Sequence, residues 1–271
     1  MSYRRVTNVT RRVTIPVMLA SVEAIFAACF RSFATLPNGA LIETDEVSGV
    51  INDIPLPFFN GIGRTRLQST ASIDEAMQPY RERQRSFRWW ISPSTQPAGL
   101  VDELRSRGFK HVYDSDGMAA RLDSVRLDAP FPPGLDIRPV ATTAALQEWA
   151  EILLTVFARP PQETALWVQA YSHLGFDGPW THYLGFNDGK AVATASVLVK
   201  GALAGVYHVA TVPDVRGRGY GAAMTLQTMR RAAEAGATDI ALQASEMGAG
   251  VYRSLGFTKC CDLTLYDWRP A

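Results

Sequence analysis

Apolar and polar positions along residues 135–268 follow the periods of strands and helices in turn. Alternation with a period of two predicts strands at 135–140, 183–186, 191–199, 206–212, 240–245 and 257–268. Helical spacing predicts helices at 143–157, 162–174, 222–235 and 250–255. The turn Asn187-Asp188-Gly189 joins two of these strands into a hairpin. Strands that alternate with helices predict a mixed α/β domain.

The residues before this region repeat the same order of elements more weakly. The pattern predicts a helix at 17–34, strands at 40–48 and 49–55, a helix at 74–85, a strand at 87–92, a helix at 98–107 and a strand at 112–122. The pentapeptide RSRGF at 105–109 matches RSLGF at 253–257 at four of five positions. Both pentapeptides follow a strand and a helix and precede a strand. We therefore expect an internal duplication of one α/β unit.

A proline-rich segment separates the two regions. Residues 129–134, APFPPG, resist both helix and central strand, so we expect a domain boundary there, with domains at 1–130 and 131–271. The apolar stretch 13–30 is interrupted or closely followed by Pro16, Glu23 and Arg31. It therefore predicts an amphipathic helix rather than a signal peptide or a membrane span, and the first dozen residues are expected to form a loose tail.

The composition narrows the classes of function. Among 271 residues, 27 basic side chains balance 26 acidic ones, and this net charge of +1 removes the usual electrostatic argument for nucleic-acid binding. The arginine-rich run 81–88 and the following Trp89-Trp90 are accordingly expected to form a solvated helix face and a core strand. Three cysteines form no disulfide framework and suit a reducing cytoplasm; with the four histidines they show no metal-ligand spacing.

The most informative motif is RGRGYG at 216–221, between a predicted strand and a predicted helix. Its three alternating glycines remove the side chains that would block close approach to the backbone. Successive backbone N–H groups can then face one concavity, and the helix dipole adds positive potential. The motif therefore predicts an anion site, most naturally for a pyrophosphate, with Arg216 and Arg218 at its rim.

Two other phosphate-binding patterns fit less well. The chain lacks the G-x-x-x-x-G-K-[ST] pattern of a P-loop. Residues 217–222 formally fit the dinucleotide pattern G-x-G-x-x-A, and Glu246 follows a strand at a tolerable distance. However, residues 213–216 separate the strand from the first glycine, where the dinucleotide turn is tight, and about 25 residues after Glu246 are too few for the further βα units of a doubly wound sheet.

The stretch VATVPDVRGRGYG at 209–221 resembles the acetyl-CoA signature of the GCN5-related N-acetyltransferase (GNAT) family, R/Q-x-x-G-x-G/A after a splayed strand. Residues 244–257, ending in Y-x-x-x-G-F, resemble the second signature of that family. The resemblance covers about residues 135–268 and implies a mixed α/β sheet. The first half resembles the degenerate copy of tandem members: it lacks R-x-x-G-x-G, and Leu104 stands where Tyr252 stands in the second half. The implied architecture is two tandem acyl-CoA N-acyltransferase domains.

The resemblance also implies roles for individual residues. It places the cofactor contacts at Val209, Ala210, Thr211, Gly217, Arg218, Gly219, Tyr220, Gly221 and Ala222. A backbone N–H on the strand at 209–211 would stabilise the oxyanion of the reaction, and Tyr252 would protonate the departing thiolate. A core tyrosine is the alternative for Tyr252. Ser245 is expected either to bind the cofactor or to cap the following helix.

The sequence therefore predicts an acetyl-CoA-dependent N-acetyltransferase that transfers an acetyl group to the primary amine of a small molecule, without a metal. A non-catalytic acyl-CoA sensor and a protein or peptide N-acetyltransferase are the alternatives. The first half is expected to wall the acceptor pocket. We expect a cytoplasmic monomer or homodimer with no nucleic-acid or membrane partner. The general base stays open among five candidates: Glu163, His173, Asp177, His182 and His208.

Overall fold

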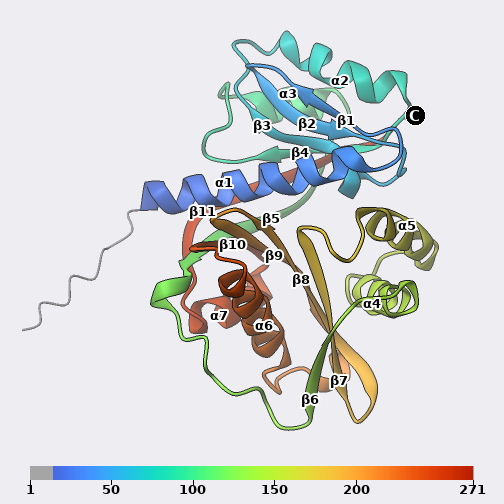
Figure 1. Cartoon of the computed structure of the whole chain (residues 1–271). Coiled ribbons are helices and arrows are strands. Elements are labelled where there is room, and N and C mark those ends of the chain that lie inside the picture. The colour runs from blue at the N-terminus through green and yellow to red at the C-terminus, as the bar shows by residue number, and fades with distance from the viewer. Residues whose placement is uncertain (1–14, 271) are drawn as a thin grey trace, which may run out of the picture.

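A computed structural model describes residues 15–270, and the tail expected at the N-terminus lies outside the described residues. The described strands form one sheet of eleven (Figure 1). In spatial order they are β1 (Ala40–Glu43), β2 (Val47–Ile51), β3 (Gly61–Thr65), β4 (Phe87–Ile91), β11 (Thr258–Trp268), β5 (Lys110–Arg121), β10 (Asp239–Ala244), β9 (Leu203–Thr211), β8 (Lys190–Lys200), β7 (Trp180–Asn187) and β6 (Leu135–Pro139). The prediction of a mixed α/β fold with a mixed sheet is confirmed.

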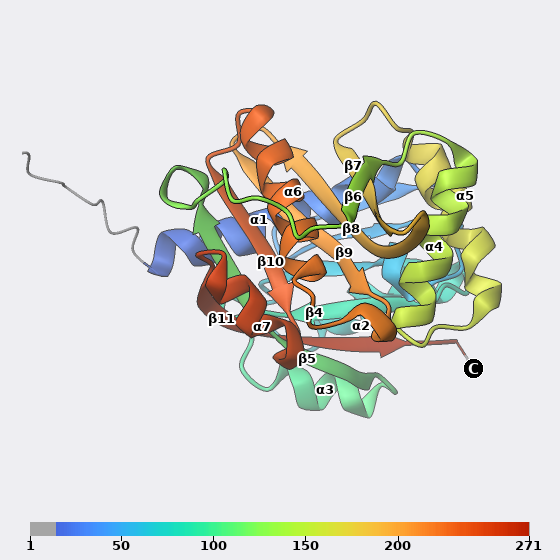
Figure 2. The ribbon, with the colours of Figure 1, turned by 90° about the horizontal axis from the view of Figure 1, so that it is seen from below.

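Seven α-helices within the described residues cover the two faces of this sheet. Their bounds are α1 (Ile15–Ser32), α2 (Ser72–Glu82), α3 (Leu100–Ser106), α4 (Thr143–Val156), α5 (Thr164–Leu174), α6 (Tyr220–Glu234) and α7 (Glu246–Ser254). Helices α1, α4 and α5 pack on one face, whereas α2 and α3, together with α6 and α7, pack on the other. Figure 2 shows α6 and α7 in front of β9 and β10, with α1 behind the sheet.

The same order of elements occurs before and after residue 130, and we call residues 15–130 the N-terminal half and residues 131–270 the C-terminal half. Each half has an antiparallel three-stranded meander, a helix that crosses over to a parallel fourth strand, a short helix and a last strand. The repeated pentapeptides close α3 and α7 in the same way. Gly108 and Gly256 have φ values of +87° and +94°, and the next phenylalanine donates its N–H back to Leu104 and Tyr252, each at 3.1 Å.

The last strands of the two halves are exchanged at the centre of the sheet. Strand β11 of the C-terminal half pairs with β4 of the N-terminal half, and β5 of the N-terminal half pairs with β10 of the C-terminal half. Strands β11 and β5 also pair with each other. The connector predicted at 129–134 lies outside strands and helices and leads into β6. Each half therefore completes its sheet with a strand of the other.

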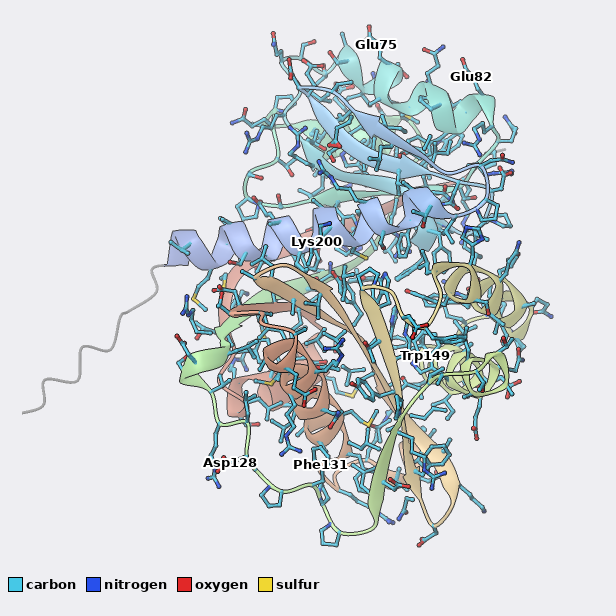
Figure 3. All side chains as sticks on the ribbon, in the orientation of Figure 1. Glu75, Glu82, Asp128, Phe131, Trp149 and Lys200 are labelled. Atoms are coloured by element: carbon cyan, nitrogen blue, oxygen red, sulfur yellow. The ribbon has the colours of Figure 1, made fainter. Side chains whose placement is uncertain are left out.

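Helix α1 lies across both halves on the face opposite α6. Val22 and Ile25 on its inner side are fully buried, and the helix contacts strands of both halves. By length and composition alone, residues 17–35 could also cross a membrane, but the buried side of this segment belongs to the core. Trp149 likewise points from α4 toward the sheet, whereas Glu75 and Glu82 project outward from α2 (Figure 3).

Several predicted bounds are wrong; for example, the strands predicted at 183–186 and 206–212 begin three residues earlier, at Trp180 and Leu203. The strand predicted at 40–48 divides into β1 and β2, and the one predicted at 49–55 stops at Ile51. Strand β3 was not expected, because Gly61 and Gly63 give it no apolar alternation. Helix α7 begins at Glu246, four residues earlier than the predicted 250. Of the run expected to form a solvated helix face, Arg88 is buried on strand β4.

Candidate functional site

Strands β9 and β10 run parallel and then separate. Their pairing extends from Leu203 and Asp239 to Val206 and Leu242 and ends there, although β9 continues to Thr211. Beyond this point β9 pairs with β8 alone, while β10 remains paired with β5. One side of the β9 backbone therefore carries free N–H and C=O groups that face a gap in the middle of the sheet. An extended ligand could add to this edge in the manner of a strand.

A bulge lies on β9 at this gap. Thr194 pairs with Ala210 and Ser196 with Tyr207, so His208 and Val209 together oppose the single residue between them on β8. His208 has a φ of +56°, and its carbonyl accepts a 2.7 Å hydrogen bond from the Thr194 hydroxyl. Bulges change the direction of backbone groups, and a non-glycine residue at positive φ is strained. The bulge turns the backbone of residues 208–211 out of the regular ladder beside the gap.

The glycine-rich loop follows β9 directly. Gly217 and Gly219 have φ values of +77° and +80°, which glycine adopts without steric cost. Gly219 is the N-cap of α6, and buried Tyr220 anchors the first turn of that helix. The Arg216 side chain ties the loop to β9 by donating Nε–H to the Thr211 carbonyl at 3.0 Å. Loop, helix start and strand end are thereby held together.

The backbone N–H groups of residues 217–222 make no hydrogen bonds to acceptors within residues 15–270. A Cβ added at Gly221 would lie 3.7 Å from the Thr211 hydroxyl, an ordinary contact, and one at Gly217 would meet nothing within 4 Å. The space beside these amides is therefore open. Unpaired N–H groups at the positive end of a fifteen-residue helix form a site for an anion.

Helix α7 carries the two other predicted site residues and packs on α6 and β10. The Ser245 hydroxyl accepts the Gly248 N–H at 3.2 Å and caps this helix, which is one of its two predicted roles. The ring of Tyr252 packs on the core under α6, with Phe257 edge-on at 6.1 Å. Burial raises the pKa of Tyr252 to about 12, so its hydroxyl stays protonated at neutral pH. That hydroxyl makes no hydrogen bond to another described residue.

Three of the five general-base candidates lie in other surroundings. Glu163 forms an ion pair with Arg159, with Nε–Oε2 at 3.0 Å. The exposed ring of His173 contacts the Thr35 carbonyl at 2.6 Å, and Asp177 is exposed in the loop after α5. These contacts leave the two histidines of β7 and β9 as the candidates nearest the gap.

His182 and His208 belong to an aromatic cluster between α4, α5 and the sheet. Trp149 is at its centre, 4.7 Å from the His182 ring and 5.1 Å from the His208 ring between centroids. Burial lowers the pKa of His182 to about 3 and that of His208 well below its usual value, so both rings are neutral. One ring nitrogen of each histidine, and the indole N–H groups of Trp149 and Trp167, are buried without a partner among the described residues. Such atoms commonly contact ordered water.

In the N-terminal half, the protein's own atoms fill the positions that correspond to the strand gap and to the open amides of the glycine-rich loop. Strands β3 and β4 also separate after a short parallel pairing. There, however, the Gln96 N–H donates to the Thr65 carbonyl at 3.1 Å, and the Leu67 N–H donates to the Gln96 carbonyl at 3.2 Å. In the loop before α2, the Gln68 N–H donates to the Glu46 carboxylate at 2.9 Å. The gap is bridged by backbone, and an amide of the loop already holds an anion.

A mixed sheet is split between two parallel strands, with a bulge on one strand and open amides at the helix that follows it. The family model described as an acetyltransferase (GNAT) domain matches residues 136–260, so this part of the chain is an acyltransferase domain of mixed α/β fold. Residues 136–260 form a domain of the GCN5-related N-acetyltransferase family. Within the described residues, no group of three or more His, Cys, Asp or Glu side chains could hold a metal ion.

Solved structures share the fold over most of the chain. A GCN5-related N-acetyltransferase from Kribbella flavida superposes with a TM-score of 0.69 at 19% identity, covering 92% of this chain and 96% of that one. A tandem GNAT protein from the clavulanic acid biosynthesis pathway gives a TM-score of 0.60 at 12% identity, with 94% and 96% covered. A GCN5-related N-acetyltransferase from Sphaerobacter thermophilus gives 0.58 at 20% identity, with 74% and 68% covered. No curated protein sequence matches the chain.

Proposed function

We propose that the protein is an acetyl-CoA-dependent N-acetyltransferase acting on the primary amine of a small molecule. The observation that carries the proposal is the set of open N–H groups at residues 217–222, next to the free edge of β9. The pyrophosphate of coenzyme A fits the first feature, because it is an anion that backbone amides can surround. Its pantetheine arm fits the second, because its amides can pair with an exposed strand edge.

The site residues then have distinct tasks. Gly217, Gly219 and Gly221 keep side chains away from the amides, and Arg218, Tyr220 and Ala222 contribute backbone N–H groups. Val209, Ala210 and Thr211 hold the pantetheine arm along β9. Ser245 caps α7 by accepting the Gly248 N–H, and its own O–H is free to donate to the cofactor. These residues would bind and orient acetyl-CoA.

Bound acetyl-CoA would supply an electrophilic thioester carbonyl. The neutral amine nitrogen bonds to that carbon as the carbon–sulfur bond breaks, and the proton that the nitrogen loses balances the one that the departing sulfur gains, giving an N-acetyl amine and the thiol of coenzyme A. A backbone N–H of residues 209–211, redirected by the bulge, would donate to the carbonyl oxygen as negative charge develops there. The protonated hydroxyl of Tyr252 would donate to the departing sulfur.

We propose two tandem domains, 1–130 and 131–271, with one active site. The closed gap and the Glu46 carboxylate in the N-terminal half support binding of a single cofactor. The N-terminal half would instead wall the acceptor pocket, since residues of α1, β4 and β5 line a cavity that also contacts Tyr207 and Gln243 beside the gap.

A peptide acceptor has less support than a metabolite. An acidic groove formed by Asp114, Asp116 and Asp262 lies under α7, but Asp116 is already paired with Lys259 at 2.8 Å. We further propose a cytoplasmic monomer or homodimer without a nucleic-acid or membrane partner. The balance of 27 basic and 26 acidic side chains supports the first of these exclusions.

Two measurements test the proposal. Isothermal titration calorimetry with acetyl-CoA should show saturable binding, and a thiol-trapping assay should show coenzyme A released when a panel of primary amines is added. Absence of binding would refute the proposal. Binding without release by any amine would instead favour the acyl-CoA sensor.

A further inference from the structure

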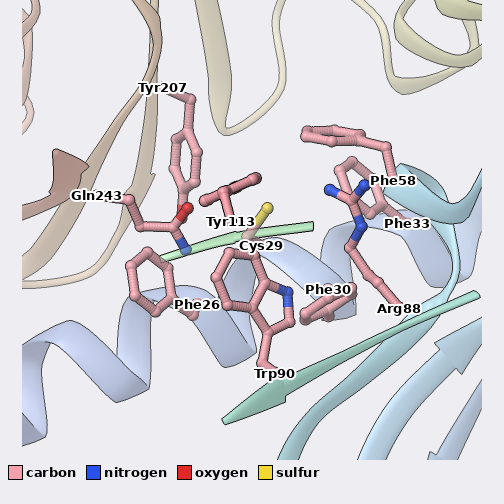
Figure 4. A pocket seen from close by; sticks show the side chains of 10 residues that line it. All are labelled: Phe26, Cys29, Phe30, Phe33, Phe58, Arg88, Trp90, Tyr113, Tyr207 and Gln243. Atoms are coloured by element: carbon pink, nitrogen blue, oxygen red, sulfur yellow. The ribbon is translucent and has the colours of Figure 1, made fainter. Parts of the chain in front are cut away.

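A cavity opens on the α1 face of the sheet, between the two halves (Figure 4). Its volume is about 50 Å³, room for on the order of four water molecules or one compact group. Ten residues line it: Phe26, Cys29, Phe30, Phe33, Phe58, Arg88, Trp90, Tyr113, Tyr207 and Gln243. Eight come from the N-terminal half and two from the C-terminal half, and five are phenylalanine or tryptophan.

One end of this cavity meets the gap between β9 and β10. Tyr207 and Gln243 are the residues directly after Val206 and Leu242, the last pair joined across these strands. Both residues lie where β9 and β10 begin to separate, so the cavity reaches the start of the gap. Figure 4 shows both side chains on one side of the cavity and those of Arg88 and Phe58 on the other.

Arg88 is the one side chain in this lining that is charged at neutral pH. Burial raises the pKa of Cys29 to about 12 and also raises that of Tyr113, so the thiol and the phenol are neutral. The remaining lining residues have no group that ionises at neutral pH. The charge on the cavity wall is therefore a single positive one, in mostly aromatic surroundings.

The Arg88 guanidinium is held loosely by the protein. Its Nε and Nη2 lie 3.3 and 3.4 Å from the Asp267 carboxylate, longer than the roughly 2.7–2.9 Å of a strong charge-assisted bond. Its Nη1 makes no hydrogen bond to any other residue in the described part of the chain. The guanidinium carbon lies 5.4 Å from the centre of the Phe58 ring, which orients the plane of the group. A buried guanidinium with a free edge is suited to a carboxylate.

We propose that this cavity binds the acceptor, and that the acceptor is an amino acid whose amine and carboxylate lie at opposite ends of a compact apolar body. The carboxylate contacts Arg88, the apolar body packs on Phe26 and Trp90, and the amine faces the gap beside Tyr207 and Gln243. This inference rests on the proposed acetyltransferase function. It assigns substrate recognition to the half of the chain that has no open anion site.

The test compares two acceptors that differ only in the carboxylate and are small enough for the cavity, 4-aminobutanoate and propylamine. With wild-type protein and acetyl-CoA, kcat/KM for coenzyme A release should be about 10- to 100-fold higher for the acid, the range expected for one hydrogen-bonded charged contact. Arg88→Met should remove this preference, with propylamine turnover within about threefold of wild type, and Arg88→Lys should restore part of it.

Two controls keep the result interpretable. Arg85→Met removes an arginine of the same segment that pairs with Asp53 at 2.9 Å and does not line the cavity, and it should retain the preference. Arg88→Met combined with Asp267→Asn avoids leaving a buried carboxylate unpaired, and it should lose the preference like the single variant. Binding of 4-aminobutanoate alone, measured as a rise in Tm, should be present in wild type and absent in Arg88→Met.

The outcomes separate this inference from the proposed function. Equal kcat/KM for the two amines, or a preference that survives Arg88→Met, overturns the acceptor assignment. Acetyl-CoA binding without acetylation of either amine also overturns it and leaves cofactor binding intact. Failure to bind acetyl-CoA at all would instead remove the proposed function.

Discussion

Gly221→Glu is the most informative test of the anion site. The structure predicts that this substitution raises the free energy of unfolding but weakens the affinity for acetyl-CoA. Gly221 is the second residue of α6, and its N–H is one of the open amides. A Cβ at this position meets only the Thr211 hydroxyl, at 3.7 Å, and no backbone strain arises. Gly219→Glu would be a poorer probe, because a φ of +80° strains any larger residue.

The effect on stability follows from the helix. Replacing glycine by glutamate within a helix gains about 0.5 kcal/mol of intrinsic propensity. A carboxylate in the first turn gains about 0.3–1 kcal/mol from the helix dipole. The free energy of unfolding should therefore rise by about 1 kcal/mol, and Tm by roughly 2 °C for a chain of this size.

The effect on binding follows from charge. The new carboxylate would lie beside the amides and compete with a pyrophosphate for them. Two unit charges about 5 Å apart at an effective dielectric constant of about 20 repel by roughly 3 kcal/mol, which corresponds to about a 100-fold weaker affinity for acetyl-CoA. Gly221→Ala adds the Cβ without the charge and should bind within about threefold of wild type.

Calorimetry with acetyl-CoA and thermal unfolding without ligand measure the two effects separately. Gly250→Glu is the matched control: Gly250 lies within α7, and a Cβ there meets nothing within 4 Å. That variant should gain stability and keep its affinity. A folded Gly221→Glu protein that binds acetyl-CoA as tightly as wild type would show that the amides of this loop do not hold the cofactor.

Three further outcomes are expected. Calorimetry should give one acetyl-CoA per chain, because backbone and Glu46 close the equivalent site in the N-terminal half; a stoichiometry of two would contradict this reading. Tyr252→Phe should lower turnover by about 100-fold with acetyl-CoA affinity within about twofold, and unchanged turnover would remove the proposed acid. Below pH 6.5 the unfolded chain binds more protons than the folded chain, because burial lowers the pKa of His182 to about 3. The free energy of unfolding is therefore fully retained above that pH and should fall by up to about 1.4 kcal/mol per pH unit below it, with a similar contribution from His208. Urea unfolding between about pH 5 and 7 measures this slope, and a slope unchanged by His182→Asn would contradict the assignment.

The glycine-rich loop could be predicted from sequence because its cause is local. Three glycines between a strand and a helix leave the backbone N–H groups uncovered by side chains, whatever the rest of the fold. The φ values of Gly217 and Gly219 are positive, as such a loop requires. The helix closures at Gly108 and Gly256 are local in the same sense. Short-range patterns of this kind also identified the mixed α/β class.

The resemblance to the acetyl-CoA signature implied a splayed strand, but the position of the gap and the bulge could not be predicted, because both depend on pairing between distant strands. Nothing in residues 203–211 by itself indicates that β9 leaves β10 after Val206, or that His208 adopts positive φ. Strand β3 was not predicted, for a related reason. A Cβ at Gly63 would lie 2.8 Å from the Phe30 ring of α1, so the packing of a remote helix accounts for a glycine that weakens the strand pattern.

The burial of Arg88 also depends on distant partners. In the sequence it ends an arginine-rich run, where a solvated position is the ordinary expectation. The strand exchange brings Asp267, 179 residues away, within 3.3 Å of its guanidinium, and α1 covers the same region. A long-range ion pair of this kind has no signature in either local segment.

Because β5 and β11 are exchanged, neither half can complete its sheet without the other. A deletion that removed residues 15–130 would take β5 from β10 and β4 from β11, and it would leave the surviving half with bare strand edges prone to aggregation. The N-terminal half is therefore required for the whole sheet, although its own loop before α2 carries no glycine-rich motif. A substitution that weakens β4 or β5 can thus destabilise strands that belong to the opposite half.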